Sequence, residues 1–144
     1  KDEIQAKFEF ERMIKIKDTT GILIQPMLSG MELFAGVKRE GLFGHMILCG
    51  LGGIFIEVLK DVSSELAPVD LKTANQMIHS LKSFPLLQGI RGQKPIHIEA
   101  FAEIITRLSA LVEAAPEIAE MDLNPLLGNE KQVVAVDARI RIEK

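Results

Sequence analysis

The sequence of 144 residues predicts an α+β fold in which helices cover one face of a largely antiparallel sheet. Three observations support this prediction. Short apolar stretches separated by glycine-rich turns come first, two helical patterns follow, and a strand-turn-strand pattern closes the chain. The chain has neither an internal repeat nor a linker long enough to divide it, so we expect a single domain over residues 1–144.

The first segment, residues 1–17, is charged and favours a helix, with Ile4, Phe8 and Ile14 on one side. We expect it to be the end of a packed helix. The helical pattern is already in progress at the first residue, which is not methionine. We therefore expect the chain to be a fragment of a longer protein.

The next stretches predict strands of a meander, because they are short, apolar and separated by turn residues. They cover residues 21–27, 30–37, 45–49 and 54–59. Two helices are expected after them. Asp70 can cap the first, whose apolar positions recur with the helical period, and the second runs from about His97 to Ala115, where Pro116 ends it.

The last segment predicts a hairpin whose two strands carry oxygen ligands. Residues two apart on a strand share a face, so one face of the first strand presents Glu120, Asp122 and Asn124. On the second strand, Asp137 and Arg139 share a face. The alternate positions of both strands are apolar, so the hairpin is expected to have one apolar side and one side with oxygen ligands.

The turn at residues 128–131 decides whether the two polar faces meet. If it places Leu127 opposite Gln132, Asp122 falls opposite Asp137. Opposed carboxylates repel each other and favour a positive partner, which Mg²⁺ would supply. The alternative is that the acids are solvated and Asp137 simply pairs with the neighbouring arginine.

The composition argues against two functional classes. The net charge is −3, the 17 Lys and Arg are scattered, and Trp and Tyr are absent, so the chain lacks the surface expected of a nucleic-acid-binding protein. Its longest apolar runs fall far short of the about 20 residues that cross a bilayer. The single cysteine, Cys49, allows no internal disulfide, is expected to be buried, and fits a reducing cytosol.

Two glycine-rich segments could bind an anion. Residues 50–53 could present backbone N–H groups to a phosphate, and a tight turn is the structural alternative. Glu57 and Asp61 follow this cluster and singly resemble ordinary surface charges. Arg91 lies within the second segment, 89–92, where it could recognise an anion or form a structural salt bridge.

Several motifs occur in an order that resembles one family. They are Gly-Ile-Leu-Ile-Gln-Pro-Met at 21–27, Gly-Met-Glu at 30–32, Gly-Leu-Gly-Gly at 50–53, Gly-Ile-Arg-Gly at 89–92, Asp-Leu-Asn-Pro-Leu at 122–126 and Asp-Ala-Arg at 137–139. Nearly the whole chain is similar to the ATP-grasp domain of NDP-forming acyl-CoA synthetases. This group includes the β-type chains of ADP-forming acetyl-CoA synthetase and is related to succinyl-CoA synthetase β chains.

The resemblance implies Mg²⁺ and ATP or ADP as cofactors. By the family's motifs, Asn124 and Asp137 would be magnesium ligands, with Asp122 beside them. The residues implied in binding the nucleotide or its phosphates are Glu32, Gly52, Gly53, Glu57 and Arg139.

The resemblance also implies that the chain is the carboxy-terminal lobe of an ATP-grasp unit. The whole enzyme would reversibly convert acyl-CoA, ADP and phosphate to the free acid, CoA and ATP, through a phosphohistidine outside this chain. The implied partners are the remainder of the ATP-grasp unit and a CoA-ligase portion, in the same chain or a partner subunit. CoA and a small carboxylic acid would be substrates, and the location would be the cytoplasm, with neither nucleic acid nor membrane as a partner.

The chain departs from the family pattern at three points. His45 stands where the family usually has proline, His97 stands where it usually has aspartate, and the half of the unit that carries the phosphate-binding lysine is absent from the sequence. The chain alone is therefore expected to be inactive. A second hypothesis is a regulatory or interaction lobe of an acyl-CoA-synthetase-like protein acetyltransferase.

Overall fold

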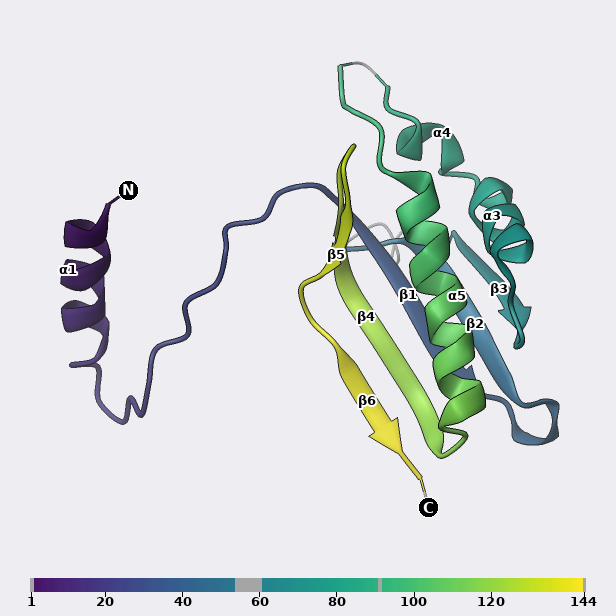
Figure 1. Cartoon of the computed structure of the whole chain (residues 1–144), viewed down its shortest axis with the longest axis horizontal. Helices are drawn as coiled ribbons and strands as arrows, with labels where there is room; N and C mark the ends of the chain where they lie inside the picture. Colours follow the sequence, from purple (N-terminus) through teal and green to yellow (C-terminus); the bar gives the residue numbers. More distant parts are fainter. Residues whose placement is uncertain (1, 54–60, 91, 144) are drawn as a thin grey trace.

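The computed structural model describes residues 2–53, 61–90 and 92–143, which contain one antiparallel sheet with helices on one of its faces (Figure 1). The strand order is β3-β2-β1-β4-β5, and β6 pairs with the same edge of β4 as β5. The strands are β1 (Met31–Arg39), β2 (His45–Leu51), β3 (Val62–Leu66), β4 (Ile118–Gly128), β5 (Val133–Ala135) and β6 (Arg139–Ile142). The helices are α1 (Glu3–Met13), α3 (Leu71–Ser80), α4 (Phe84–Leu87) and α5 (Ile98–Ala114). The predicted α+β class is confirmed.

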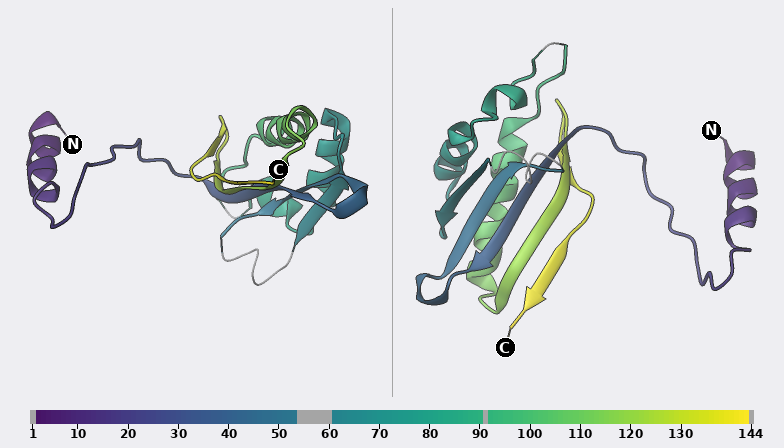
Figure 2. Two further views of the ribbon diagram at one scale, coloured as in Figure 1. Left: turned by 90° about the horizontal axis from the view of Figure 1, so that it is seen from below. Right: turned by 180° about the vertical axis from the view of Figure 1, so that it is seen from behind.

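The hydrophobic core lies between the sheet and the helices α3 and α5, which cover the same face (Figure 2). Leu33, Ala35 and Val37 alternate along β1 and belong to the same buried cluster as Phe101 and Ile105 of α5. Side chains alternate between the two faces of a strand, so the residues between them point the other way. We call this other side of the sheet, which the helices do not cover, the open face.

Both predicted helices are present, and side chains cap them. The Asp70 carboxylate accepts a hydrogen bond of 2.7 Å from the Thr73 backbone N–H at the start of α3. His97 accepts one of 3.2 Å from Ala100 at the start of α5. The short helix α4 was not predicted, because four residues that include Pro85 are too few to reveal a helical period.

The N-terminal arm, residues 2–29, differs from the prediction. It contains α1 followed by an extended segment, and Figure 1 shows it reaching away from the sheet. The strand predicted at 21–27 is not formed, and Leu23, Ile24 and Met27 are exposed. A strand needs a hydrogen-bonding neighbour, and the described residues supply none here. The packed helix expected at 1–17 is likewise exposed along its length.

Two differences from the prediction concern the strands that follow β2. The strand expected at 54–59 lies outside the described residues. Strand β3 was missed because its sequence, Val-Ser-Ser-Glu-Leu, is mostly polar and lies exposed at the edge of the sheet. Edge strands need no alternating apolar pattern, since pairing with β2 supplies their hydrogen bonds on one side.

The closing hairpin forms in a different register from the one predicted. Leu127 pairs with Val134, and not with Gln132. The side chain of Asn129 sets the turn, because its oxygen accepts hydrogen bonds from the Lys131 and Gln132 backbone N–H groups at 2.9 and 3.1 Å. The shift is two residues, so the partner of each residue changes. The alternation of β4 is interrupted between Leu123 and Leu126, which are both buried, and Val133, not Val134, packs against the core.

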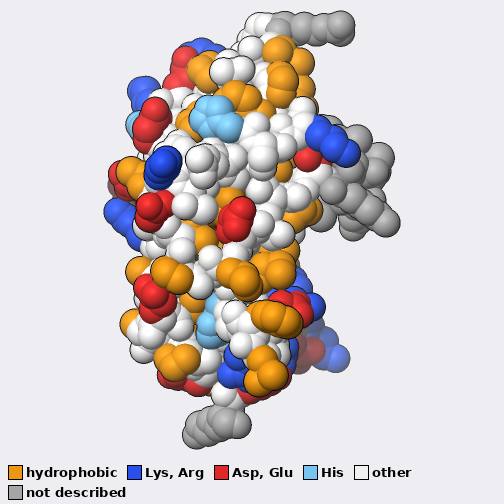
Figure 3. All heavy atoms as spheres, turned by 90° about the vertical axis from the view of Figure 1, so that its right-hand side faces the viewer, with side chains coloured by type: hydrophobic (Ala, Val, Ile, Leu, Met, Phe, Trp, Pro, Cys, Tyr) orange, Lys and Arg blue, Asp and Glu red, His pale blue; other side chains and the backbone are white. Residues whose placement is uncertain are grey.

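The exposed surface agrees with the scattered charge of the sequence. On the side seen in Figure 3, acidic and basic side chains alternate with apolar ones, and no basic area is continuous there. Among the described residues, no helix combines the length and apolar character needed to span a membrane.

Asp61 should contribute to stability in a pH-dependent way. Its carboxylate accepts hydrogen bonds from the Lys82 and Ser83 backbone N–H groups at 3.0 and 2.6 Å. Burial pushes the pKa of Asp61 upward, but hydrogen bonds from Ser83 and Lys82 and the Lys82 charge outweigh it, so the pKa is lowered. We expect Asp61→Ala to cost about 1.5–3 kcal/mol of unfolding free energy at pH 7, as for hydrogen bonds to a charged group.

The effect of Asp61 should be present above the carboxyl's unfolded pKa, about 3.9, and should be lost as the pH falls through the lower pKa of the folded state. Urea unfolding of both proteins across this range measures it. A loss in Asp61→Ala that does not change with pH would contradict this account.

Cys49 should be unreactive in the folded protein. It is buried in the core, and burial, with a smaller effect of the Asp61 charge, raises its pKa to about 12. The thiolate is the reactive form, so we expect an aromatic disulfide reagent at pH 8 to label Cys49 only after denaturation. Because the sequence has one cysteine, the absorbance signal reports this site alone. Labelling of the native protein at the rate of the denatured one would contradict the prediction.

Candidate functional site

The open face of β4 carries the polar residues predicted for the site. Met121 and Leu123 line an apolar groove with Ile104 and Leu108 of α5, so they face the helices. Glu120 and Asp122, which alternate with them, therefore lie on the open face, and Asn124 follows at the point where the alternation of β4 is interrupted.

The neighbouring strands place side chains beside these acids in two rows across the sheet. In the first row, Asp122 pairs with Gly36 of β1 on one side and with Arg139 of β6 on the other. In the second row, the pairs of Glu120 are Lys38 and Arg141. The predicted pairing of Asp122 with Asp137 is therefore wrong, because the turn at Asn129 shifts the register by two residues.

Asp137 lies between β5 and β6, at the level of Asn124. The pairs Leu126 with Ala135 and Asp122 with Arg139 are separated by four residues on both strands, so one register continues between them. Between these pairs, the Val136 N–H donates a 3.0 Å hydrogen bond to the Pro125 carbonyl. This register brings Asp137 opposite Asn124. The predicted ligands Asp122, Asn124 and Asp137 thus lie on neighbouring segments, in a pairing different from the predicted one.

The charge balance around Asp122 is incomplete. Burial raises the pKa of its carboxyl, the Arg139 charge opposes that rise, and the Glu120 and Asp137 charges add to it. Arg139 is 3.7 Å from Asp137, measured between Nε and Oδ2, whereas Asp122 has no ion pair within 4.0 Å among the described residues. By contrast, Glu120 Oε2 lies 3.3 Å from Arg141 Nε. The Asp122 carboxylate is therefore the less neutralised of the two.

A second group of predicted residues meets at the beginning of β1. The Gly52 N–H donates a hydrogen bond of 2.7 Å to the Glu32 carbonyl. Gly53 has a φ of 62°, and a Cβ there would contact the Glu32 carboxylate. The backbone conformation therefore favours glycine at this position, and the Glu32 side chain would have to move to admit a larger residue. Glu57, which was predicted to join this group, lies outside the described residues.

A cleft of about 870 Å³ opens beside Glu32, and sequence reasoning missed it. Its volume is in the range of small-molecule sites. The signal that could have located it is the glycine-rich segment 89–92, of which Ile90 and Gly92 line the cleft and Arg91 lies outside the described residues. The other lining residues are Ser29, Gly30, Met31, Leu51, Leu86, Gln93, Lys94, Pro95, Gly128 and Asn129.

Two histidines singled out in the sequence have structural roles. His45 Nε2 donates a 2.7 Å hydrogen bond to the Ile118 carbonyl, at the end of the sheet opposite Glu32, and His97 caps α5. Neither residue is near Asp122 in the sheet.

The donor set on the open face fits a hard cation. Two carboxylates and one amide offer oxygen only, and Mg²⁺ typically takes one or two protein carboxylates while waters and phosphates complete its coordination. Among the described residues, no cluster of three or more His, Cys, Asp or Glu side chains could enclose a metal by itself. The arrangement is thus a partial site that suits a cation delivered with phosphates.

A family model described as the ATP-grasp domain matches residues 3–142. The chain belongs to the ATP-grasp domain family. The domain is 45% identical over 124 residues to the β subunit of acetate–CoA ligase [ADP-forming] I from Pyrococcus furiosus, covering 85% of this chain and 53% of that protein. It therefore spans about half the length of this curated relative.

Solved structures give the same family. This ATP-grasp domain matches the apo dinucleotide-forming acetyl-coenzyme A synthetase 1 of Candidatus Korarchaeum cryptofilum with a TM-score of 0.87 and 37% identity, covering 99% of this chain and 68% of that one. A complex of that enzyme with coenzyme A and Mg-AMPPCP matches with a TM-score of 0.78 and 40% identity, covering 81% and 55%. The predicted resemblance to ADP-forming acetyl-CoA synthetases is confirmed.

We predict that Asp122→Asn stabilises the metal-free domain. Because the pKa of Asp122 is raised, the folded state binds its proton more tightly than the unfolded chain does. Stability therefore falls as the pH rises from about 3.9 through the pKa of the folded state. At pH 7 the neutral amide should increase the unfolding free energy by about 0.2–1 kcal/mol, the size of a cross-strand charge effect.

Urea unfolding in the presence of a chelator measures this change, with Glu120→Gln as the matched control. Since Glu120 is already ion-paired, its replacement should leave stability equal or slightly lower. Equal destabilisation by both variants would contradict the conclusion that Asp122 is less neutralised than Glu120.

Proposed function

We propose that this ATP-grasp domain is the nucleotide- and magnesium-binding lobe of an ADP-forming acyl-CoA synthetase. The whole enzyme interconverts acyl-CoA, ADP and phosphate with the free acid, CoA and ATP, through a phosphohistidine outside this chain. The proposal is supported by the relative from Pyrococcus furiosus, an ADP-forming acetate–CoA ligase subunit, and by the Korarchaeum enzyme, which binds coenzyme A and Mg-AMPPCP.

The observation that carries the proposal is the set of oxygen donors on the open face. Asn124 and Asp137 hold the magnesium ion in this proposal, and Asp122 adds a ligand or orients a bound water. A magnesium ion held there would supply the positive charge that phosphoryl transfer needs. Arg139, whose Nε lies 3.7 Å from Asp137 Oδ2, orients that carboxylate.

The group at the beginning of β1 serves the nucleotide in the same proposal. Gly52 and Gly53 carry no side chain, so phosphate can approach the backbone closely there. Glu32, whose carboxylate lies against Gly53, faces the nucleotide beside the large cleft. Glu57 is retained as a member of this group on the family resemblance alone.

The partners follow from the length of the relatives. Because the chain spans about half of its Pyrococcus relative, we propose that the rest of the ATP-grasp unit and a CoA-ligase portion complete the enzyme, in the same chain or as another subunit. CoA and a small carboxylic acid are then substrates of the assembled enzyme. The buried, unpaired Cys49 agrees with a cytoplasmic location.

A titration of this chain with Mn²⁺, with and without ADP, tests the proposal. Paramagnetic broadening of residue-resolved NMR signals should centre on Asp122, Asn124 and Asp137 and should strengthen with ADP, because the nucleotide phosphates complete the coordination. Asp137→Ala should remove the broadening, and Glu120→Gln should retain it. Broadening that is absent, or equally strong in Asp137→Ala, would reject the metal site and favour a regulatory or interaction lobe.

In the full-length enzyme, Asp137→Ala should lower turnover more than about 100-fold, beyond the loss typical for an outer partner of a metal ligand. The circular dichroism spectrum should be unchanged, because Asp137 is an exposed residue between two strands. Normal turnover in this variant would exclude Asp137 from the mechanism.

A further inference from the structure

The two rows across the open face differ in one position on β1. In the row of Glu120, β1 contributes Lys38, and in the row of Asp122 it contributes Gly36. On β6 both rows have an arginine, Arg141 and Arg139. The two rows thus lie on the same strands and the same face, and each contains one carboxylate on β4. Comparing the rows shows what a cationic side chain on β1 adds.

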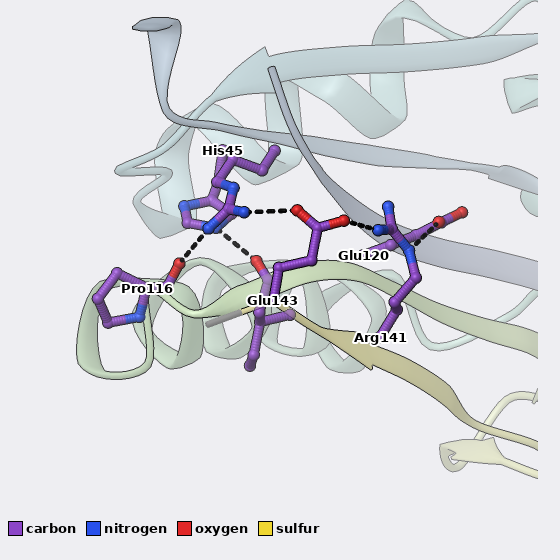
Figure 4. A network of polar contacts seen from close by, with 7 residues as sticks. His45, Pro116, Glu120, Arg141 and Glu143 are labelled. Atoms are coloured by element: carbon purple, nitrogen blue, oxygen red, sulfur yellow. Dashed lines mark hydrogen bonds and ion pairs between the residues drawn. The ribbon is translucent and has the colours of Figure 1, made fainter. Parts of the chain in front are cut away.

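The row of Glu120 is fully occupied by side-chain cations. Figure 4 shows Arg141 between the carboxylates of Glu120 and Glu143. Glu143 in turn lies 2.7 Å from Arg39, measured between Oε2 and Nη2. Lys38 stands on the other side of Glu120 and also pairs with Glu40 at 2.7 Å. Each acid here therefore has a cation from the protein itself.

In the row of Asp122, none of the described cationic side chains lies within ion-pair distance of the acid. Arg139 is 83% exposed and has Asp137 as its nearest acid, at 3.7 Å. On the β1 side nothing projects from Gly36 over the open face. A Cβ built at Gly36 would lie 3.0 Å from the Met121 carbonyl oxygen, so a larger residue requires the backbone to shift by a few tenths of an ångström. Gly36 is itself buried, and β1 contributes no side chain beside Asp122.

We infer that Gly36 is a specificity-determining residue of the magnesium site, because it leaves the position beside Asp122 to a divalent cation and not to a lysine or arginine of β1. This inference rests on the proposed function. A side-chain ammonium there would occupy the position that Lys38 occupies beside Glu120. It would neutralise Asp122 permanently and compete with the metal, since like charges near one carboxylate repel.

The test compares Gly36→Lys with Gly36→Met, two side chains of similar length of which only one is charged. The readout is the Mn²⁺ dissociation constant of this chain, from broadening of the Asp122 and Asn124 signals, together with the melting temperature. We expect Gly36→Met to bind Mn²⁺ within about threefold of the unchanged chain and Gly36→Lys at least about 10-fold more weakly, a difference of about 1.4 kcal/mol. Equal constants for the two variants would overturn the inference.

A second design tests the same point if the long side chains prevent folding. Gly36→Cys is folded first and then modified with a methanethiosulfonate that adds either an aminoethyl or an ethyl group, while Cys49 stays protected in the core. The charged product should lose Mn²⁺ affinity and the neutral one should keep it. Equal loss in both would overturn the inference in favour of a steric effect.

Failure of the inference and failure of the proposed function are separable. If the unchanged chain shows no broadening at Asp122, Asn124 and Asp137, the proposed function fails and this inference fails with it. If the unchanged chain binds Mn²⁺ there and the charged and uncharged variants behave alike, only the role of Gly36 is rejected. Lys38→Gly, the matched change in the other row, should leave Mn²⁺ affinity unchanged.

Discussion

The pairing of β4 along both of its edges is the constraint on which the site depends. β1 holds one edge, and β5 and β6 hold the other, so β4 cannot slide or rotate without breaking backbone hydrogen bonds on two sides. The buried side chains of β4, such as Leu123 and Leu126, fix which face meets the helices. Asp122, next to Leu123, must then face away from the core. The chemistry of the open face is thus decided by the apolar residues of the other face.

Sequence reasoning identified the face of Glu120 and Asp122 and missed their partners. Alternation along a strand is a local property, so the placement of these two acids on one face followed from spacing alone, whereas the interruption between Leu123 and Leu126 did not. Register depends on how the turn closes, and there the Asn129 side chain bonds to two backbone N–H groups. That choice pairs Asp137 with an amide instead of a second carboxylate. Repulsion between directly opposed carboxylates therefore cannot be the reason to expect a metal ion here. The expectation of a metal ion rests on the oxygen donors themselves.

Other features were beyond the sequence for different physical reasons. The cleft is assembled from the start of β1, the end of β2, the segment after α4 and the turn beyond β4, and no local pattern reports their meeting. The apolar residues at 21–27 were predicted as a strand because they have the composition of one, yet composition does not supply a neighbouring strand. The helices were predictable, because α3 and α5 each bury one apolar stripe and carry their own caps. The sequence singled out three residues near the start of β1, namely Glu32, Gly52 and Gly53. The contact between them is a tertiary feature that no local pattern predicts.

Helix α1 has eleven residues and no buried side chain, and isolated helices shorter than about 12–15 residues are marginal in water. Its order is therefore not secured by tertiary contacts with the rest of the described chain. The free energy to fold α1 must be supplied largely by whatever it contacts, so its folding is coupled to docking. The helix content of the arm therefore reports its docking. Spectroscopy can follow this helix content without a label and without an activity assay.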